Sequence, residues 1–448
     1  MRILYALRSS DHFSYQETII RELCLLGHIV HFIYDKKWSK STAGIQSGIE
    51  TIPNFKKYEF VYRNDFWRPF IFFIRELRSY ASYLRREDQS NYYTRRWYSY
   101  QPYWLNRLIY EFPIINKWIA SERMDIFFTW FEGIVPPDRK IVRSISMLSP
   151  DVVIVSPINL RFSEEVEYLK AAKKMGIPTV GIVLSWDNLT TKGLFHIIPD
   201  MLLAWNQTHM QEAVEVHHVP GDKIIITGAP VFDKWFGIED LLSNRRDFCG
   251  KVGLNPDMPY IVYLGSSKNI AKDETWLVAE LGEALSKSSL PDLKEMQILV
   301  RPHPANAEIY QSVLSDKIVV WPKEGSLPDS TTTLQDFYNT LKHSVATVGI
   351  NTSGMIDAII NDIPGIAFVA DKYLETQEQA VHFKHLSQAK ALDEVTTIED
   401  CLQAIFSLYN GEDLRKDARF NFIRSFIRPC GLETSAGKIS ALAVEQLI

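Results

Sequence analysis

Three short polar segments in the second half of the sequence each follow an apolar run that predicts a buried parallel strand. They are Gly265-Ser266-Ser267, Arg301-Pro302-His303-Pro304 and Asn351-Thr352-Ser353-Gly354. Parallel strands of an α/β layer end at the same edge of the sheet, and ligands bind beyond that edge. We therefore expect the three segments to line one pocket. Their hydroxyl and backbone N–H groups, with an arginine and a histidine, favour an anionic, phosphate-bearing ligand.

The segment around His303 is the most specific of the three. A proline on each side fixes the backbone and removes two N–H donors. With Arg301 beside it, His303 could bind a diphosphate, stabilise it as it leaves, or donate a proton. The alternative is a structural histidine that caps the next helix. Its place among three such segments favours the functional interpretation.

Thr352 and Ser353 open a predicted helix that runs to Ile360, and a helix N-terminus favours phosphate. Asp357 lies one turn further along and could accept hydrogen bonds from ribose hydroxyls. The alternatives are an ordinary helix cap and a solvated carboxylate. Ser266 and Ser267 offer two more hydroxyls at the first segment. We interpret Asp273-Glu274, which follow, as ordinary first-turn carboxylates.

Two polar segments in the first half are also candidates. In residues 185–193, Trp186 could stack on a sugar and Asp187 could act as a base, although an Asx-turn network would explain the same residues. Near the N-terminus, Asp11 or His12 could deprotonate an acceptor hydroxyl, or the segment could simply cap a helix.

The elements that must position these residues form two alternating series of strands and helices. Strands are predicted at 2–7, 29–34, 151–156, 179–184, 201–204 and 223–227, and again at 260–264, 297–300, 317–321, 346–349 and 365–369. This rhythm predicts an α/β protein with two Rossmann-like doubly wound domains facing across a cleft. We place the domains at 1–240 and 250–430, with a C-terminal helix at 431–448.

A helical, aromatic-rich insertion of about 56–148 interrupts the first series. Residues 56–105 hold ten Lys/Arg against five Asp/Glu, and 17 aromatic residues. The region could lie on an anionic membrane surface. We favour the alternative, a helical hairpin whose aromatic residues are core.

Composition excludes several classes of protein. A length of 448 residues suggests two or three domains, and the formal net charge of −5 argues against a nucleic-acid binder. The four cysteines lie far apart without CxxC spacing, which indicates neither a zinc site nor a disulfide framework. The N-terminus lacks a signal-peptide pattern, and no apolar run reaches 18 residues. We expect a cytoplasmic protein, in solution or at the inner face of the membrane.

The sequence resembles the GT-B glycosyltransferases. The resemblance rests on the two halves, Gly228-Ala229-Pro230-Val231-Phe232-Asp233 after a strand, Arg301 to Pro304, and Thr352-Ser353 with Asp357. Within that family, the sequence most resembles the branch of CDP-glycerol glycerophosphotransferases and capsule Kdo- and sialic-acid transferases. In that branch an HP motif and a Ser-Ser or Ser/Thr pair hold the donor phosphates. By that resemblance His303, Thr352 and Ser353 bind the donor. The acidic-acidic-Gly motif of sialyltransferases is not evident, so the nucleotide and the stereochemistry stay open.

Together these features predict a metal-independent glycosyltransferase of surface polysaccharide or glycoconjugate biosynthesis, without a cofactor. The C-terminal domain would bind a CMP-, CDP- or UDP-linked sugar through Ser266, Ser267, Arg301, His303, Thr352, Ser353 and Asp357. The N-terminal domain would bind a glycan or lipid-linked acceptor, with Asp187, His12 or Asp11 as base. The alternatives are a sugar-nucleotide epimerase of the same fold and a non-catalytic, membrane-docked scaffold with a vestigial pocket.

Overall fold

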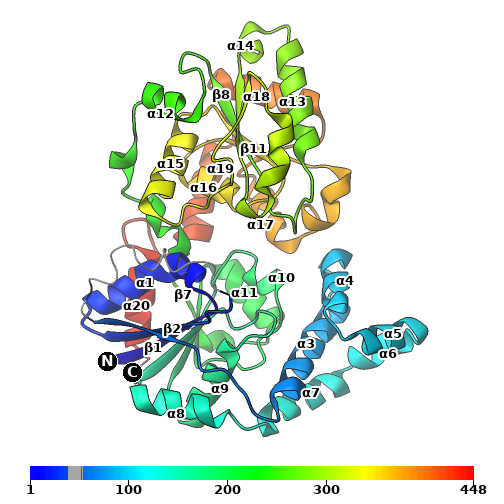
Figure 1. The fold of residues 1–448 in the computed structure, drawn as a ribbon, viewed down its shortest axis with the longest axis vertical. Coiled ribbons are helices and arrows are strands. Elements are labelled where there is room, and N and C mark those ends of the chain that lie inside the picture. The colour runs from blue at the N-terminus through cyan, green and yellow to red at the C-terminus, as the bar shows by residue number, and fades with distance from the viewer. Residues whose placement is uncertain (39–51, 53, 448) are drawn as a thin grey trace. The chain divides into compact units, whose positions relative to one another are not determined.

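The computed structural model describes residues 1–38, 52 and 54–447 of the chain. It divides into two compact units, one of Met1–Asp233 with Arg424–Ile448 and one of Lys234–Ile423. Each unit contains a parallel β-sheet covered by helices (Figure 1). This confirms the predicted pair of doubly wound α/β domains.

The sheet of the first unit has seven parallel strands in the order β3-β2-β1-β4-β5-β6-β7. Their bounds are β1 (Arg2–Leu7), β2 (Ile29–Tyr34), β3 (Phe55–Glu59), β4 (Val152–Ser156), β5 (Thr179–Ile182), β6 (Met201–Ala204) and β7 (Ile224–Ile226). The central strands are nearly continuous apolar runs because helices cover both of their faces.

Helices of the first unit pack on both faces of this sheet. They are η1 (Ser10–His12), α1 (Phe13–Leu25), α9 (Glu165–Lys174), α10 (Asn188–Thr191), α11 (Gln207–Glu215), η3 (Gly221–Lys223) and α20 (Ala436–Glu445). The helices α1 and α20 share one hydrophobic core with β1 and β2. The last helix of the chain is therefore part of the first unit.

Asp233 fixes the point at which the chain leaves and re-enters the first unit. Its buried carboxylate accepts hydrogen bonds from Arg428 at 2.6 Å and from the backbone N–H groups of Ala436 and Gly437 at 3.0 and 2.8 Å. The short elements η4 (Pro230–Trp235) and η8 (Ile423–Ile427) make the two crossings. Asp233, the last residue of the segment that supports the family resemblance, thus has a structural role.

The insertion consists of helices that follow β3. They are α3 (Arg68–Arg85), α4 (Asn91–Ser99), α5 (Tyr103–Glu111), α6 (Ile114–Ile119), α7 (Glu122–Ile134) and α8 (Arg139–Leu148). The expected start near residue 56 falls instead in β3, which pairs parallel to β2. Some aromatic residues of 56–105 are core, as predicted, including Tyr80, Tyr83, Tyr93 and Trp97.

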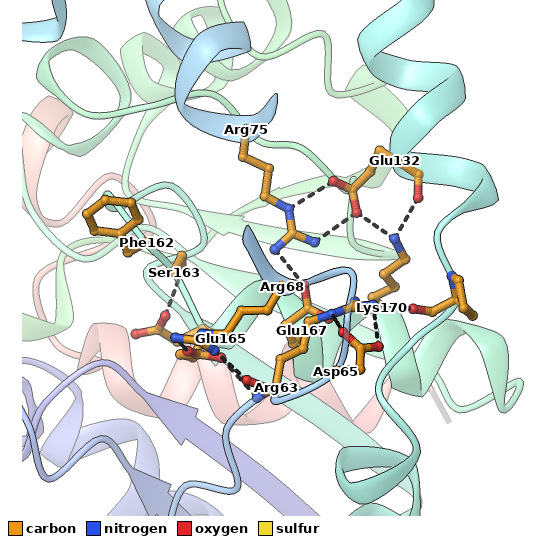
Figure 2. A network of polar contacts seen from close by, with 12 residues as sticks. Arg63, Asp65, Arg68, Arg75, Glu132, Phe162, Ser163, Glu165, Glu167 and Lys170 are labelled. Atoms are coloured by element: carbon orange, nitrogen blue, oxygen red, sulfur yellow. Dashed lines mark hydrogen bonds and ion pairs between the residues drawn. The ribbon is translucent and has the colours of Figure 1, made fainter. Parts of the chain in front are cut away.

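A network of buried charges attaches the insertion to the sheet (Figure 2). Arg75 on α3 forms two hydrogen bonds of 2.8 Å with Glu132 on α7 and an ion pair of 2.6 Å with Glu167 on α9. Lys170 on α9 reaches Glu132 at 2.8 Å, and Arg63 reaches Glu167 at 2.8 Å. Burial alone would raise the pKa of Glu132, but Arg75 and Lys170 hold it well below its usual value.

The sheet of the second unit has six parallel strands in the order β10-β9-β8-β11-β12-β13. Their bounds are β8 (Tyr260–Leu264), β9 (Gln297–Arg301), β10 (Ile318–Val320), β11 (Thr347–Gly349), β12 (Gly365–Phe368) and β13 (Asp393–Val395). The strands expected from the apolar runs are all present. Order and parallel direction follow from the right-handed crossovers that helices provide.

Helices of the second unit follow the strands in alternation. They are η5 (Glu239–Leu241), α12 (Arg245–Val252), α13 (Thr275–Lys287), α14 (Pro291–Lys294), η6 (Pro304–Val313), α15 (Thr331–Lys342), α16 (Gly354–Ile360), η7 (Asp371–Thr376), α17 (Val381–Ala389), α18 (Ile398–Tyr409) and α19 (Lys416–Phe422). In the described part of the chain, no helix is long and apolar enough to cross a lipid bilayer.

Breaking the charge network should destabilise the first unit. In Glu132→Gln, Arg75 loses its bidentate partner and Lys170 keeps a buried charge, so we expect unfolding free energy to fall by about 3–5 kcal/mol. Urea denaturation followed by circular dichroism measures the change. Asp257→Asn is the control, because the Arg246–Asp257 pair is 70% and 71% exposed and should contribute nothing measurable. Equal midpoints for the two variants would contradict a structural role of the network.

Candidate functional site

The three polar segments of the second half lie side by side. Leu264 at the end of β8 pairs with Arg301 at the end of β9 and with Gly349 at the end of β11. The three strands are neighbours in the sheet and end at the same level. The turns after them therefore share one carboxyl edge, as the sequence predicts.

Two glycines let these turns pack closely. A Cβ atom on Gly265 would lie 2.7 Å from the hydroxyl of Tyr310 and 3.2 Å from the Cα atom of Pro302. Gly325 has φ +71°, and a Cβ atom there would lie 2.7 Å from the carbonyl oxygen of Pro302. Any larger residue at either position would push the first turn, or the loop after β10, away from the His303 turn.

His303 caps the short helix η6. Its Nδ1 atom accepts the backbone N–H of Ala305 at 3.0 Å, which is the structural alternative considered from the sequence. In a neutral imidazole this acceptor role places the proton on Nε2. The cap thus fixes a tautomer whose second nitrogen is a hydrogen-bond donor. Capping and phosphate binding are compatible at this residue.

Arg301 points away from the turns and into the unit. Its buried guanidinium lies 2.5 Å from Asp336 on α15 and donates to Ser326 at 3.2 Å. It also lies 5.0 Å from the ring centre of Phe337. Its charge is balanced by Asp336, so in this structure Arg301 anchors the His303 turn to α15. Direct contact between Arg301 and a diphosphate stays a prediction.

Ser266 rests on a carboxylate that we interpreted as an ordinary helix residue. Its backbone N–H donates to Glu274 at 2.5 Å, and Glu274 also accepts from Tyr263 at 2.9 Å and Tyr310 at 2.7 Å. Glu274 is fully buried, and burial raises its pKa. The sequence interpretation of Glu274 was wrong, because the tyrosines that hold it come from β8 and η6. Ser267, next in the turn, is half-buried.

The third turn places its two hydroxyl residues differently from Asp357. Thr352 accepts the N–H of Gly354 at 3.3 Å, and Ser353 is exposed at the start of α16. Asp357 is buried and accepts the indole N–H of Trp235 at 2.6 Å. Burial raises the pKa of Asp357 to about 6. The ribose contact predicted for Asp357 stays a prediction, while its visible partner is Trp235.

In the first unit, Asp187 sits in a local hydrogen-bond network after β5. Its carboxylate accepts from Ser185 at 2.7 Å, from Thr191 at 2.8 Å and from Lys192 at 2.9 Å. Such a network is the structural alternative considered for this segment. A base at this position would have to exchange its contact with Lys192 for a substrate hydroxyl.

His12 and Asp11 follow β1, which is separated from β5 in the sheet by β4. Burial, together with the charges of Arg8 and Lys192, lowers the pKa of His12 to about 4, so its imidazole is neutral at pH 7. Within the described residues, the Nδ1 atom of His12 has no hydrogen-bond partner. Asp11 is exposed. Lys192, which donates to Asp187, is thus one of the charges that lower the pKa of His12.

A separate cavity of about 380 Å³ lies between the insertion and the segment after β4. Phe72, Phe73, Tyr100 and Phe162 line it together with Glu76, and burial raises the pKa of Glu76 to about 7. None of the predicted site residues lines this cavity. In the described part of the chain, no group of three or more His, Cys, Asp or Glu side chains is placed to hold a metal ion.

No family model matches the sequence, and no curated protein matches it. Solved structures do resemble the fold. UDP-GlcNAc 2-epimerase from Methanocaldococcus jannaschii, in complex with UDP-GlcNAc and UDP, matches with a TM-score of 0.55 and 14% identity, covering 100% of this chain and 99% of that one. UGT89C1 from Arabidopsis thaliana, complexed with UDP, matches with a TM-score of 0.53 and 13% identity over 100% of both chains.

A glycosyltransferase from Rickettsia africae matches with a TM-score of 0.52 and 12% identity, covering 100% of this chain and 98% of that one. At such identities the comparisons establish the fold. The two parallel-sheet units and these neighbours show that this chain has the GT-B fold.

The burial of Asp357 makes a pH-dependent prediction. Folding raises its pKa from 3.8 to about 6, so above pH 6 the buried, ionised carboxylate lowers the free energy of unfolding. This loss of stability shrinks as the pH falls toward 3.8, because the carboxyl group is then protonated in the folded state. Asp357→Asn keeps an acceptor for Trp235 and removes the charge. We expect it to stabilise the protein by about 3 kcal/mol at pH 7.5 and by about half as much at pH 5. Urea denaturation at both pH values tests this, and a gain independent of pH would refute the assignment.

Proposed function

We propose that this protein is a glycosyltransferase that uses a nucleotide-activated sugar as donor. The observation that carries the proposal is the alignment of the Ser267, His303 and Ser353 turns at one carboxyl edge of the second sheet, on a GT-B fold. Similar structures of this fold hold UDP or UDP-GlcNAc. A diphosphate at this edge would meet hydroxyl groups, backbone N–H groups and an imidazole donor.

The proposed donor site uses the turns in two ways. Ser267, His303, Thr352 and Ser353 contact the phosphates directly. The other three residues do not contact the donor in this proposal but support the turns through buried partners. These pairs are Ser266 with Glu274, Arg301 with Asp336, and Asp357 with Trp235. This arrangement refines the predicted set, in which all seven residues contact the donor.

In the proposed reaction an acceptor hydroxyl attacks the anomeric carbon of the sugar. The bond between that carbon and the phosphate oxygen breaks, and the nucleotide leaves with the electron pair. His303 donates a hydrogen bond from Nε2 to the leaving phosphate, and the surrounding N–H groups stabilise its charge in place of a metal ion. The proton of the acceptor passes to a base of the first unit.

His12 is the base we favour. Its Nδ1 atom is buried without a partner, whereas Asp187 is bound to Lys192 and Asp11 is exposed. An anionic substrate beside His12 would favour the imidazolium and raise its low pKa.

The acceptor is a glycan or lipid-linked glycan of surface polysaccharide biosynthesis, reached at the inner face of the membrane. The HP motif keeps the donor choice within CMP-, CDP- and UDP-sugars.

The second candidate function is sugar-nucleotide epimerisation. The similarity to UDP-GlcNAc 2-epimerase from Methanocaldococcus jannaschii favours it, because that enzyme shares the fold over the whole chain. The two reactions differ in what they consume. An epimerase converts its sugar nucleotide without an acceptor, whereas a transferase releases nucleotide only as an acceptor is glycosylated.

The donor site is tested by thermal-shift titration with CMP, CDP, UDP and GDP. We expect one pyrimidine nucleotide to stabilise the protein, and His303→Ala or Ser353→Ala to weaken its binding about tenfold or more, since each removes a charge-assisted hydrogen bond of about 1.5–3 kcal/mol. Ser286→Ala is the control, because this exposed serine bonds within α13, near its C-terminal end. If no nucleotide stabilises the protein, the proposal fails. Conversion of a sugar nucleotide without acceptor would favour the epimerase.

The base is tested with a pair of neighbouring variants. His12→Asn should lower the turnover number for transfer at least about a hundredfold while leaving the nucleotide-induced thermal shift intact. Asp11→Asn should change the turnover number little, because that side chain is exposed. Full activity of His12→Asn, or a large loss in Asp11→Asn, would show that another residue accepts the proton.

A further inference from the structure

The insertion exposes an unusual number of large apolar side chains. Tyr103, Trp104, Tyr110, Trp118, Ile126 and Trp130 each leave more than half of their surface in solvent. They come from α5, α6 and α7 of the first unit. The sequence placed the aromatic-rich stretch at 56–105 and favoured a core role. The structure instead shows that exposed rings continue to residue 130, beyond the predicted stretch.

Ring contacts join Trp130 to neighbouring rings on α7 and at the start of α3. Along α7, Trp130 lies 5.9 Å from Phe127, which lies 6.1 Å from Phe131. Phe131 contacts Trp67 at 6.2 Å. We call the surface formed by the exposed rings of α3, α5, α6 and α7 the aromatic face.

The run of rings extends from Trp67 to Phe70, and a separate ring pair joins α3 to α5. Trp67 lies 5.8 Å from Phe66, which lies 5.1 Å from Phe70, and Phe73 one turn later lies 5.9 Å from Trp104. Large contiguous apolar patches are rare on monomeric proteins and mark binding surfaces.

Helix α7 shows that the exposure follows a helical pattern. Phe128 and Glu132 point into the unit, while Ile126, Trp130 and Ile134 recur every four residues on an exposed side. A solvent-facing helix surface normally carries polar residues. The row of Ile126, Trp130 and Ile134 is therefore an apolar stripe that nothing in the described chain covers.

Charge identifies the class of partner. Residues 66–148 carry 13 Lys/Arg against 8 Asp/Glu, in a chain whose formal net charge is −5. Lys117, Arg123 and Arg95 are exposed on or beside the aromatic helices. Tryptophan and tyrosine with flanking cations are typical of segments that lie at the interface of an anionic bilayer.

We propose that the aromatic face docks the protein on an anionic lipid bilayer. The rings of α5, α6 and α7 enter the interfacial region, and Lys117 and Arg123 contact the lipid headgroups. The charge network around Arg75 and Glu132 holds these helices to the first sheet, so docking fixes the first unit at the surface. Docking needs no nucleotide and stands apart from the donor site.

Vesicle co-sedimentation of the full chain tests the proposal. We expect binding to phosphatidylcholine vesicles that contain phosphatidylglycerol, little binding to phosphatidylcholine alone, and weaker binding at high salt. The triple variant Trp104→Ser, Trp118→Ser, Trp130→Ser should lose at least about tenfold in vesicle affinity. The control Leu25→Ser, Leu414→Ser removes two side chains that are 75% and 90% exposed outside the insertion. It should bind as the wild type does.

A charge variant tests the contribution of the cations separately from that of the aromatic rings. Lys117→Glu with Arg123→Glu should remove the preference for phosphatidylglycerol. Circular dichroism and the thermal midpoint confirm that each variant is folded. Equal binding of wild type to both kinds of vesicle, or unchanged binding of the triple variant, would overturn the proposal.

The oligomeric state gives a further decisive outcome. If light scattering finds a dimer that the triple variant converts to a monomer, the aromatic face joins two copies of this chain and the lipid proposal is wrong. A protein that binds vesicles but no nucleotide would support docking and refute the donor site. The two proposals can therefore fail independently.

Discussion

The register at Leu264 is the constraint on which the candidate donor site depends. Because this residue pairs with Arg301 on one side and Gly349 on the other, three strands end at one level and deliver their turns to the same edge. A shift of one residue in either pairing would move a turn by about 3.3 Å along the sheet. The tight packing at Gly265 and Gly325 also holds the turns in this alignment, since neither position has room for a side chain.

Buried charge in this unit supports the turns from inside. Arg301 is neutralised by Asp336, and Glu274 is held by two tyrosines and the backbone of Ser266. These groups cannot leave their partners without exposing a buried charge or donor. They fix the backbone of the turns, whereas His303 and Ser353 carry the groups at the surface. A division between buried anchors and surface donors is what a preorganised phosphate site requires.

Strand positions, the two doubly wound halves and the shared edge were predictable because continuous apolar runs between helices have few other arrangements. The partners of individual polar residues were not. Asp336 lies 35 positions from Arg301, and Tyr310 lies 36 positions from Glu274, so no local pattern links either pair. The return of α20 to the first unit was equally hidden, because its core contacts with α1 join opposite ends of the chain.

The insertion also shows what the sequence pattern cannot predict. Periodicity predicts which side of a helix is apolar but does not decide whether that side is covered. The buried side of α3 carries both kinds of side chain, since Arg75 lies there with Phe72 and Tyr80, while Phe70 near the start of the helix is exposed. Glu132 and Glu167 neutralise Arg75 in the interior. Neither the buried arginine nor the exposed ring follows from periodicity, because both depend on which other elements pack against the helix.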